Sequence, residues 1–108
     1  MTYLEIAQMV QEIGLPFTYF DFPDDTEEAP PYICYYYDYN DYKADNENYV
    51  TRNTLYIDFY AANRDFTHEQ TIESTLKTNG FSYGKEVVFN ESERLWQTRY
   101  TTEVLING

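Results

Sequence analysis

The last part of the chain alternates between two kinds of residue with the period of a β-strand. Within residues 94–106, every second position is occupied in turn by Trp96, Thr98, Tyr100, Thr102, Val104 and Ile106, and the positions between them include Gln97, Arg99, Thr101 and Glu103. Successive side chains of a strand point to opposite faces of its sheet. The pattern therefore predicts a strand in a sheet that has one buried face and one wet face.

Four other segments also have the character of strands. Residues 50–61 alternate in the same way, and Leu55, Ile57 and Phe59 are expected to face the core. The aromatic run 32–37 follows Pro30-Pro31 and predicts a strand that is covered on both sides or nearly so. Shorter strands are predicted at 17–22 and 81–90, and the turn at 90–92 would join the last two strands in a hairpin.

Two helices are predicted from their capping boxes. Thr2-Tyr3-Leu4-Glu5 would begin a helix at about 3–13, which stops before Gly14 and Pro16. Thr67-His68-Glu69-Gln70 would begin a second helix at about 68–79, which Gly80 closes. Its apolar face is narrow, as expected for a helix that lies on a sheet.

The order of the elements is thus α-β-β-β-α-β-β, with short links. This order predicts an α+β fold, a mostly antiparallel sheet of four to five strands with two helices packed on one face. A chain of 108 residues fits one domain, so residues 1–108 are expected to form a single unit.

The composition is strongly acidic, with 19 Asp and Glu against 7 Lys and Arg and a formal net charge of -12. Binding to nucleic-acid phosphates needs clustered basic residues, so sequence-specific nucleic-acid binding is not expected. Acidic chains are often disordered, but 13 Tyr and 7 Phe predict a folded one. The sequence has no long apolar run and no leader-like start, so we expect no membrane association and a cytoplasmic protein.

The residue types of common active sites are present but not in the patterns that chemistry needs. Cys34 lies in a predicted strand and is expected to be a small buried residue, and His68 lies in a predicted helix turn. The acidic segment 38–49 fails as a calcium loop, because Lys43 and Tyr49 occupy the positions that need Gly and Glu. We expect no catalytic residue, metal site or cofactor, and no enzymatic activity.

Tyrosines on the wet face of the sheet have two interpretations. Tyr and Arg are enriched at protein interfaces, so this face is a candidate contact surface. The alternative, equally open from the sequence, is that the rings form cross-strand pairs that stabilise the sheet. The candidate contact residues are Arg52, Tyr56, Asp58, Tyr60, Arg99 and Glu103.

Four segments carry a resemblance to a known family, namely LEIAQMVQEIGLPFTY, PYICYYYDY, NYVTRNTLYIDFYAANRD with EQTIESTLKTNG, and ESERLWQTRYTTEVLI. The order of these segments along the chain and the character of their residues resemble those of the neck and tail-completion proteins of long-tailed bacteriophages, which include tail terminators and head-to-tail connectors. The resemblance implies a virion structural protein that assembles in the bacterial cytoplasm as a ring, commonly of six copies. It also implies tail-tube and head-connector proteins as partners.

Two further expectations concern the acidity. In a ring, carboxylates that face the lumen would repel DNA and let it pass, and the best candidates are the acidic loop residues Asp38, Asp41, Asp45 and Glu47. The competing interpretation is a small acidic inhibitor that mimics DNA and blocks a DNA-binding enzyme. The basic residues on the long strands count against it, because a mimic needs an evenly spaced anionic face.

Overall fold

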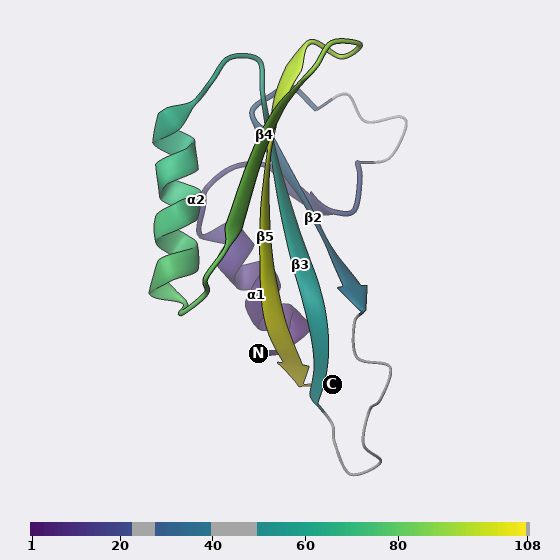
Figure 1. Cartoon of the computed structure of the whole chain (residues 1–108), viewed down its shortest axis with the longest axis vertical. Helices are drawn as coiled ribbons and strands as arrows, with labels where there is room; N and C mark the ends of the chain where they lie inside the picture. The colour runs from purple at the N-terminus through teal and green to yellow at the C-terminus, as the bar shows by residue number, and fades with distance from the viewer. Residues whose placement is uncertain (23–27, 40–49, 108) are drawn as a thin grey trace.

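The computed structural model describes residues 1–22, 28–39 and 50–107. The order of its elements is that predicted from the sequence (Figure 1). They are α1 (Tyr3–Gln11), β1 (Phe17–Tyr19), β2 (Tyr32–Tyr39), β3 (Val50–Ala61), α2 (Phe66–Thr78), β4 (Gly84–Asn90) and β5 (Leu95–Asn107). The α+β class is thereby confirmed.

The five strands form one sheet in the order β1-β2-β3-β5-β4. Strands β2 to β5 pair with antiparallel neighbours, but β1 pairs with β2 in parallel, so the sheet is mixed. The longest ladder joins β3 and β5 from Val50 opposite Asn107 to Ala61 opposite Trp96. A parallel pair needs a long connection, and residues 20–31 supply it between β1 and β2.

Both helices pack on the same face of the sheet and enclose the core with it (Figure 1). Helix α1 contributes Ile6, Met9 and Val10, all nearly inaccessible to solvent. The facing residues of the sheet are the predicted ones, with Leu55, Ile57 and Phe59 from β3 and Tyr100, Val104 and Ile106 from β5. The opposite face of the sheet carries neither helix.

Helix α1 begins as predicted. The Thr2 hydroxyl accepts from the Glu5 N–H at 3.1 Å, and the Glu5 carboxylate accepts from the Thr2 N–H at 2.8 Å, which completes the capping box. The helix ends at Gln11, two residues before the predicted end, and Gly14 follows with a φ of 87°, a conformation that favours glycine.

Helix α2 begins differently from the prediction. Its N-cap is Asp65, whose carboxylate accepts from the His68 N–H at 3.0 Å, and Thr67 lies inside the first turn. The predicted capping box at Thr67 is therefore wrong. Asp65 and Thr67 can both cap a helix, and the sequence offers the two starts side by side.

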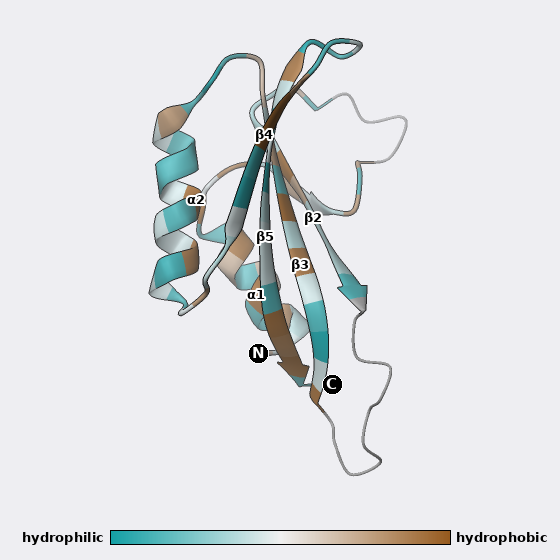
Figure 2. Cartoon of the chain, viewed as in Figure 1, coloured by the Kyte–Doolittle hydropathy of each residue, from teal (hydrophilic) through white to brown (hydrophobic). Residues whose placement is uncertain are grey.

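Helix α2 is held to the sheet by polar contacts as well as by Ile72 and Leu76. Most residues along the α2 ribbon are hydrophilic or intermediate in hydropathy (Figure 2). The Glu69 carboxylate is buried and accepts from Arg64 at 3.3 Å and from Lys85 of β4 at 2.8 Å. The Tyr100 hydroxyl of β5 donates to Glu73 at 2.9 Å. These contacts explain how a helix with so narrow an apolar face keeps its place.

In the described part of the chain, no helix is long and apolar enough to cross a membrane.

Candidate interaction surface on the open face of the sheet

The uncovered face of the sheet, here called the open face, carries all six candidate contact residues. On β3, Arg52, Tyr56, Asp58 and Tyr60 alternate with the core residues, so they point away from the helices. On β5, Arg99 lies opposite Asp58, and Glu103 lies opposite Thr54. These six residues therefore share the face of the sheet that points away from the helices, as predicted, and their role in contacts between subunits stays a prediction.

An ion pair lies at the centre of the open face. Arg99 binds Asp58 with two hydrogen bonds, from Nε to Oδ1 at 2.8 Å and from Nη2 to Oδ2 at 3.0 Å. Asp58 is only 3% exposed, while the Arg99 side chain is 35% exposed. The hydrogen bonds to Asp58 raise the pKa of Arg99 above its ordinary value, although burial opposes this. Asp58 is thus held within its own chain and is not a free surface carboxylate.

Two stacked tyrosine pairs flank this ion pair. Tyr36 of β2 stacks on Tyr56 with ring centres 4.9 Å apart, and Tyr32 stacks on Tyr60 at 5.1 Å. The interpretation of these tyrosines as cross-strand pairs is therefore confirmed for Tyr56 and Tyr60. Burial first, and then the Asp58 carboxylate, raise the pKa of Tyr60. The guanidinium of Arg99 lies 4.9 Å from the Tyr56 ring centre, a cation-π contact.

A hollow of about 330 Å³, here called the open-face hollow, lies between the two tyrosine pairs. Its floor is made by Cys34, Asp58 and Arg99, which lie in one cross-strand row. The side chain of Cys34 is shorter than the tyrosines on either side, so this row is lower than its neighbours. Aromatic rings of Phe20, Tyr32, Tyr36 and Tyr60 form the walls, and the carboxylates of Asp21 and Glu93 complete the lining.

Burial lowers the reactivity of the thiol in this hollow. Cys34 is 4% exposed, as predicted for a small buried residue. Burial raises the pKa of Cys34 to about 11, and the carboxylates of Asp21 and Asp58 contribute to the shift. Because a thiolate is needed for nucleophilic attack, this cysteine has a packing role.

Phe20 is the residue of the hollow that sequence reasoning placed least well. It was expected inside the strand 17–22, but β1 ends at Tyr19 and Phe20 adopts a left-handed backbone with a φ of 70°. This conformation is strained for a bulky side chain. The Phe20 ring lies edge-on to Tyr36 with centres 5.8 Å apart, and it is 68% exposed. No local sequence signal distinguishes this turn from a continued strand.

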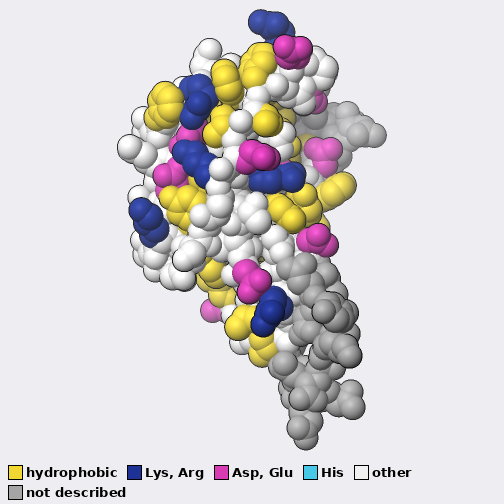
Figure 3. Space-filling model, viewed as in Figure 1, with side chains coloured by type: hydrophobic (Ala, Val, Ile, Leu, Met, Phe, Trp, Pro, Cys, Tyr) yellow, Lys and Arg dark blue, Asp and Glu magenta, His cyan; other side chains and the backbone are white. Residues whose placement is uncertain are grey.

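The outer end of the open face carries an exposed ion pair. Arg52 and Glu103 approach to 3.7 Å, with side chains 60% and 64% exposed. Pairs of this kind contribute little to stability. Acidic and basic side chains lie next to one another on the visible face of the described residues (Figure 3).

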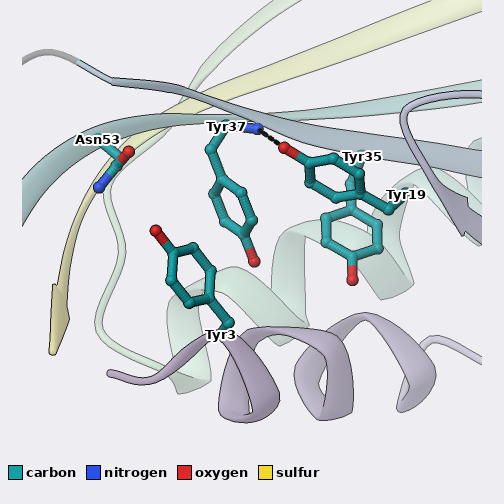
Figure 4. A pocket seen from close by; sticks show the side chains of 5 residues that line it. All are labelled: Tyr3, Tyr19, Tyr35, Tyr37 and Asn53. Atoms are coloured by element: carbon teal, nitrogen blue, oxygen red, sulfur yellow. Dashed lines mark hydrogen bonds between the residues drawn. The ribbon is translucent and has the colours of Figure 1, made fainter. Parts of the chain in front are cut away.

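A second hollow, of about 540 Å³, lies between α1 and the end of β2 (Figure 4). It is lined by Tyr3, Tyr19, Tyr35, Tyr37 and Asn53. Tyr3 reaches up from α1 to meet the Tyr37 ring edge-on at 5.1 Å, and the Tyr19 hydroxyl accepts from the Tyr37 N–H at 3.4 Å. Burial, and then the neighbouring tyrosines, raise the pKa of Tyr37. The lining of this hollow thus consists of four phenol rings and one amide.

The remaining predicted residues are dispersed. Asp38 is exposed near the end of β2, and Asp41, Asp45 and Glu47 lie outside the described residues, as does most of the segment compared with a calcium loop. Glu91 and Glu93 are exposed in the turn between β4 and β5. His68 lies in the first turn of α2, with Nδ1 2.6 Å from the Asp65 carboxylate. In residues 1–22, 28–39 and 50–107, no three His, Cys, Asp or Glu side chains gather as a metal site would require.

Comparison of the sequence with models of known protein families, and with curated proteins, gives no match.

Proposed function

We propose that this chain is a structural protein of the neck or tail end of a long-tailed bacteriophage, or of a prophage, that forms a ring to terminate the tail tube and join it to the head. The observation that carries the proposal is the open face, because both helices cover the other face of the sheet. A small domain that leaves a whole sheet face rich in Tyr and Arg uncovered has a large surface suited to contacts.

A ring needs two different surfaces on each subunit, since head-to-tail contacts join unlike patches. The open face over β1 to β3 offers one. The edge strand β4 offers the other, because it ends the sheet in the described residues and exposes Val88 at 46% and Phe89 at 37%. Exposed edge strands of this kind are places where another chain can add.

The ionisable groups of the open-face hollow favour a structural role over catalysis. The Asp58 carboxylate is occupied by Arg99, and the Cys34 thiol is protonated at neutral pH. Neither is available as a base or nucleophile. The proposal therefore assigns no enzymatic activity to this chain.

The charge distribution supports the ring over the DNA-mimic alternative. The net charge of -12 would keep DNA from adhering in a lumen. Arg52 and Arg99 interrupt the acidic groups of the open face by pairing with Glu103 and Asp58. An anionic mimic of a phosphate backbone would not place basic residues there. The proposed partners are further copies of this chain, commonly six to a ring, with tail-tube and head-connector proteins, and the site of assembly is the host cytoplasm before incorporation into the virion.

Native mass spectrometry over a concentration series, with negative-stain images of the largest species, tests the proposal. We expect a closed ring, with or without isolated tail tubes as a template. The variant Val88→Asp should dissociate the ring because it places a charge on the β4 edge. Leu4→Asp is the matched control, since Leu4 is 67% exposed on α1, where an acid in the first turn does not disturb the helix.

A species that stays monomeric even with tail tubes present would refute the ring. Equal effects of Val88→Asp and Leu4→Asp would refute the role of β4. Inhibition of a DNA-binding enzyme by the monomer would support the mimic instead.

A further inference from the structure

The two tyrosine pairs of the open face differ in one respect. The Tyr36 and Tyr56 pair holds a cation, since the Arg99 guanidinium lies 5.8 Å and 4.9 Å from the two ring centres. Among the described residues, no Lys or Arg lies over Tyr32 or Tyr60. These two rings also form walls of the open-face hollow.

The hollow carries more negative than positive charge. Its lining holds the carboxylates of Asp21, Asp58 and Glu93 and a single guanidinium, that of Arg99. Arg99 and Asp58 neutralise one another, so Asp21 and Glu93 are left without an opposite charge in the lining. Burial raises the pKa of Tyr32, and Cys34, Glu93 and Asp21 raise it further, which fits a negative potential at that ring.

We propose that the open-face hollow is a docking site for a lysine or arginine side chain of a different, basic protein with which this chain assembles. Aromatic faces attract cations through the ring quadrupole, and carboxylates at the rim add a charge-assisted hydrogen bond to the entering group. A volume of about 330 Å³ accommodates one such side chain.

Charge complementarity favours a different protein over a second copy of this chain. Most basic side chains of the described residues are already paired, Arg52 with Glu103, Arg64 and Lys85 with Glu69, and Arg99 with Asp58. Only Lys77 and Arg94 have no ion pair among the residues described, and the whole chain carries -12. A basic partner would bring free cations to the hollow, whereas a second copy of this chain has few unpaired basic side chains to place there.

The site itself can be tested with Nα-acetylarginine methylamide as the probe. Nuclear magnetic resonance of isotope-labelled tyrosine rings should show saturable shifts at Tyr32, Tyr36 and Tyr60. The matching citrulline compound, which has the same shape without the charge, should cause none. Equal shifts from both compounds would overturn the proposal, as would shifts spread over all tyrosines.

Two variants and one control variant sharpen this test. Glu93→Gln should weaken probe binding about threefold, because it removes one rim carboxylate. Glu91→Gln is the matched control in the same exposed turn, and it should leave binding unchanged because Glu91 does not line the hollow. Tyr32→Leu should weaken binding about fivefold through loss of a cation-π face. Equal effects of the two Glu variants would overturn the proposal. Thermal melting of each variant checks that it is folded.

The source of the docked side chain is tested by oligomeric state. This proposal rests in part on the proposed assembly role, but probe binding does not require a ring, so the two can fail separately. The double variant Lys77→Gln/Arg94→Gln should form the same species as the parent chain in native mass spectrometry. Loss of the ring in this variant, with probe binding intact, would show that a second copy fills the hollow and would refute the different partner.

Discussion

The ion pair between Asp58 and Arg99 provides the sharpest test of how the open face is stabilised. Substituting Arg99→Met keeps an unbranched apolar stem and removes the guanidinium group with its charge. The Asp58 carboxylate, only 3% exposed, then loses both hydrogen bonds and stays buried among the tyrosines. Asp58→Asn is the milder change, because its amide oxygen can still accept from the guanidinium and Arg99 reaches solvent.

The size of the effect follows from burial. Breaking a buried ion pair from one side costs about 3–5 kcal/mol. The Arg99 side chain is 35% exposed, so water can partly solvate the stranded carboxylate, and we expect about 2–3 kcal/mol for Arg99→Met. For Asp58→Asn we expect about 1 kcal/mol. The double variant contains no stranded charge, and its cost should fall short of the sum of the two single changes by about 1–2 kcal/mol.

Urea unfolding followed by fluorescence of Trp96, the single tryptophan, measures these free energies. All variants are compared at one protein concentration, since assembly would shift apparent stability. The exposed pair Arg52 and Glu103 is the control, and the same cycle with Arg52→Met and Glu103→Gln should give a coupling below about 0.5 kcal/mol. Additive costs at Asp58 and Arg99, or equal coupling at both pairs, would refute the argument that burial decides the strength of the pair.

Two further predictions concern single groups. At pH 8, Cys34 of the folded protein should react with a disulfide reagent about 100-fold more slowly than a thiol with the ordinary pKa of 9.0, because burial raises the pKa of Cys34 to about 11. Labelling in denaturant should restore the ordinary rate. Equal rates in the folded and the denatured protein would contradict the burial of this thiol. Asp65→Ala should cost about 1 kcal/mol by removing the N-cap of α2, while Asp65→Asn keeps the cap. Hydrogen bonds from the His68 side chain and backbone lower the pKa of Asp65. The stability that the Asp65 carboxylate contributes is therefore fully present above its unfolded-state pKa of 3.8, and it is lost as the pH falls through the lower pKa of the folded state. If Asp65→Asn left the acid unfolding curve unchanged, this reasoning would be wrong.

The long strands could be predicted from the sequence because their signal is local. Strand β3 has the predicted bounds, and β5 begins and ends one residue later than predicted, since alternation reports which side of a sheet is wet. The first strand was harder. Its three residues carry no information about direction, and its parallel pairing with β2 depends on where residues 20–31 return the chain.

In the candidate site, too, the features set by local sequence could be predicted and those set by the packing of the whole sheet could not. Tyr56, Tyr60 and Arg99 could be assigned to one face from their positions within two strands. The ring partners Tyr36 and Tyr32 could not, because the alignment of β2 against β3 is set by the packing of the whole sheet and not by either strand alone. The hollow depends in addition on Cys34, a small residue between larger ones, and on the turn at Phe20.

The unequal lengths of the strand ladders have a mechanical consequence. Twelve residue pairs join β3 to β5, whereas only three join β1 to β2. A pull along the axis of β3 loads its long ladder in shear, so many hydrogen bonds must break together. A pull on β1 can instead peel three residues away while β3, β5 and both helices stay in place. Under tension β1 would therefore detach first, next to Phe20 in the wall of the open-face hollow. Binding of a docked side chain would then weaken before the domain unfolds.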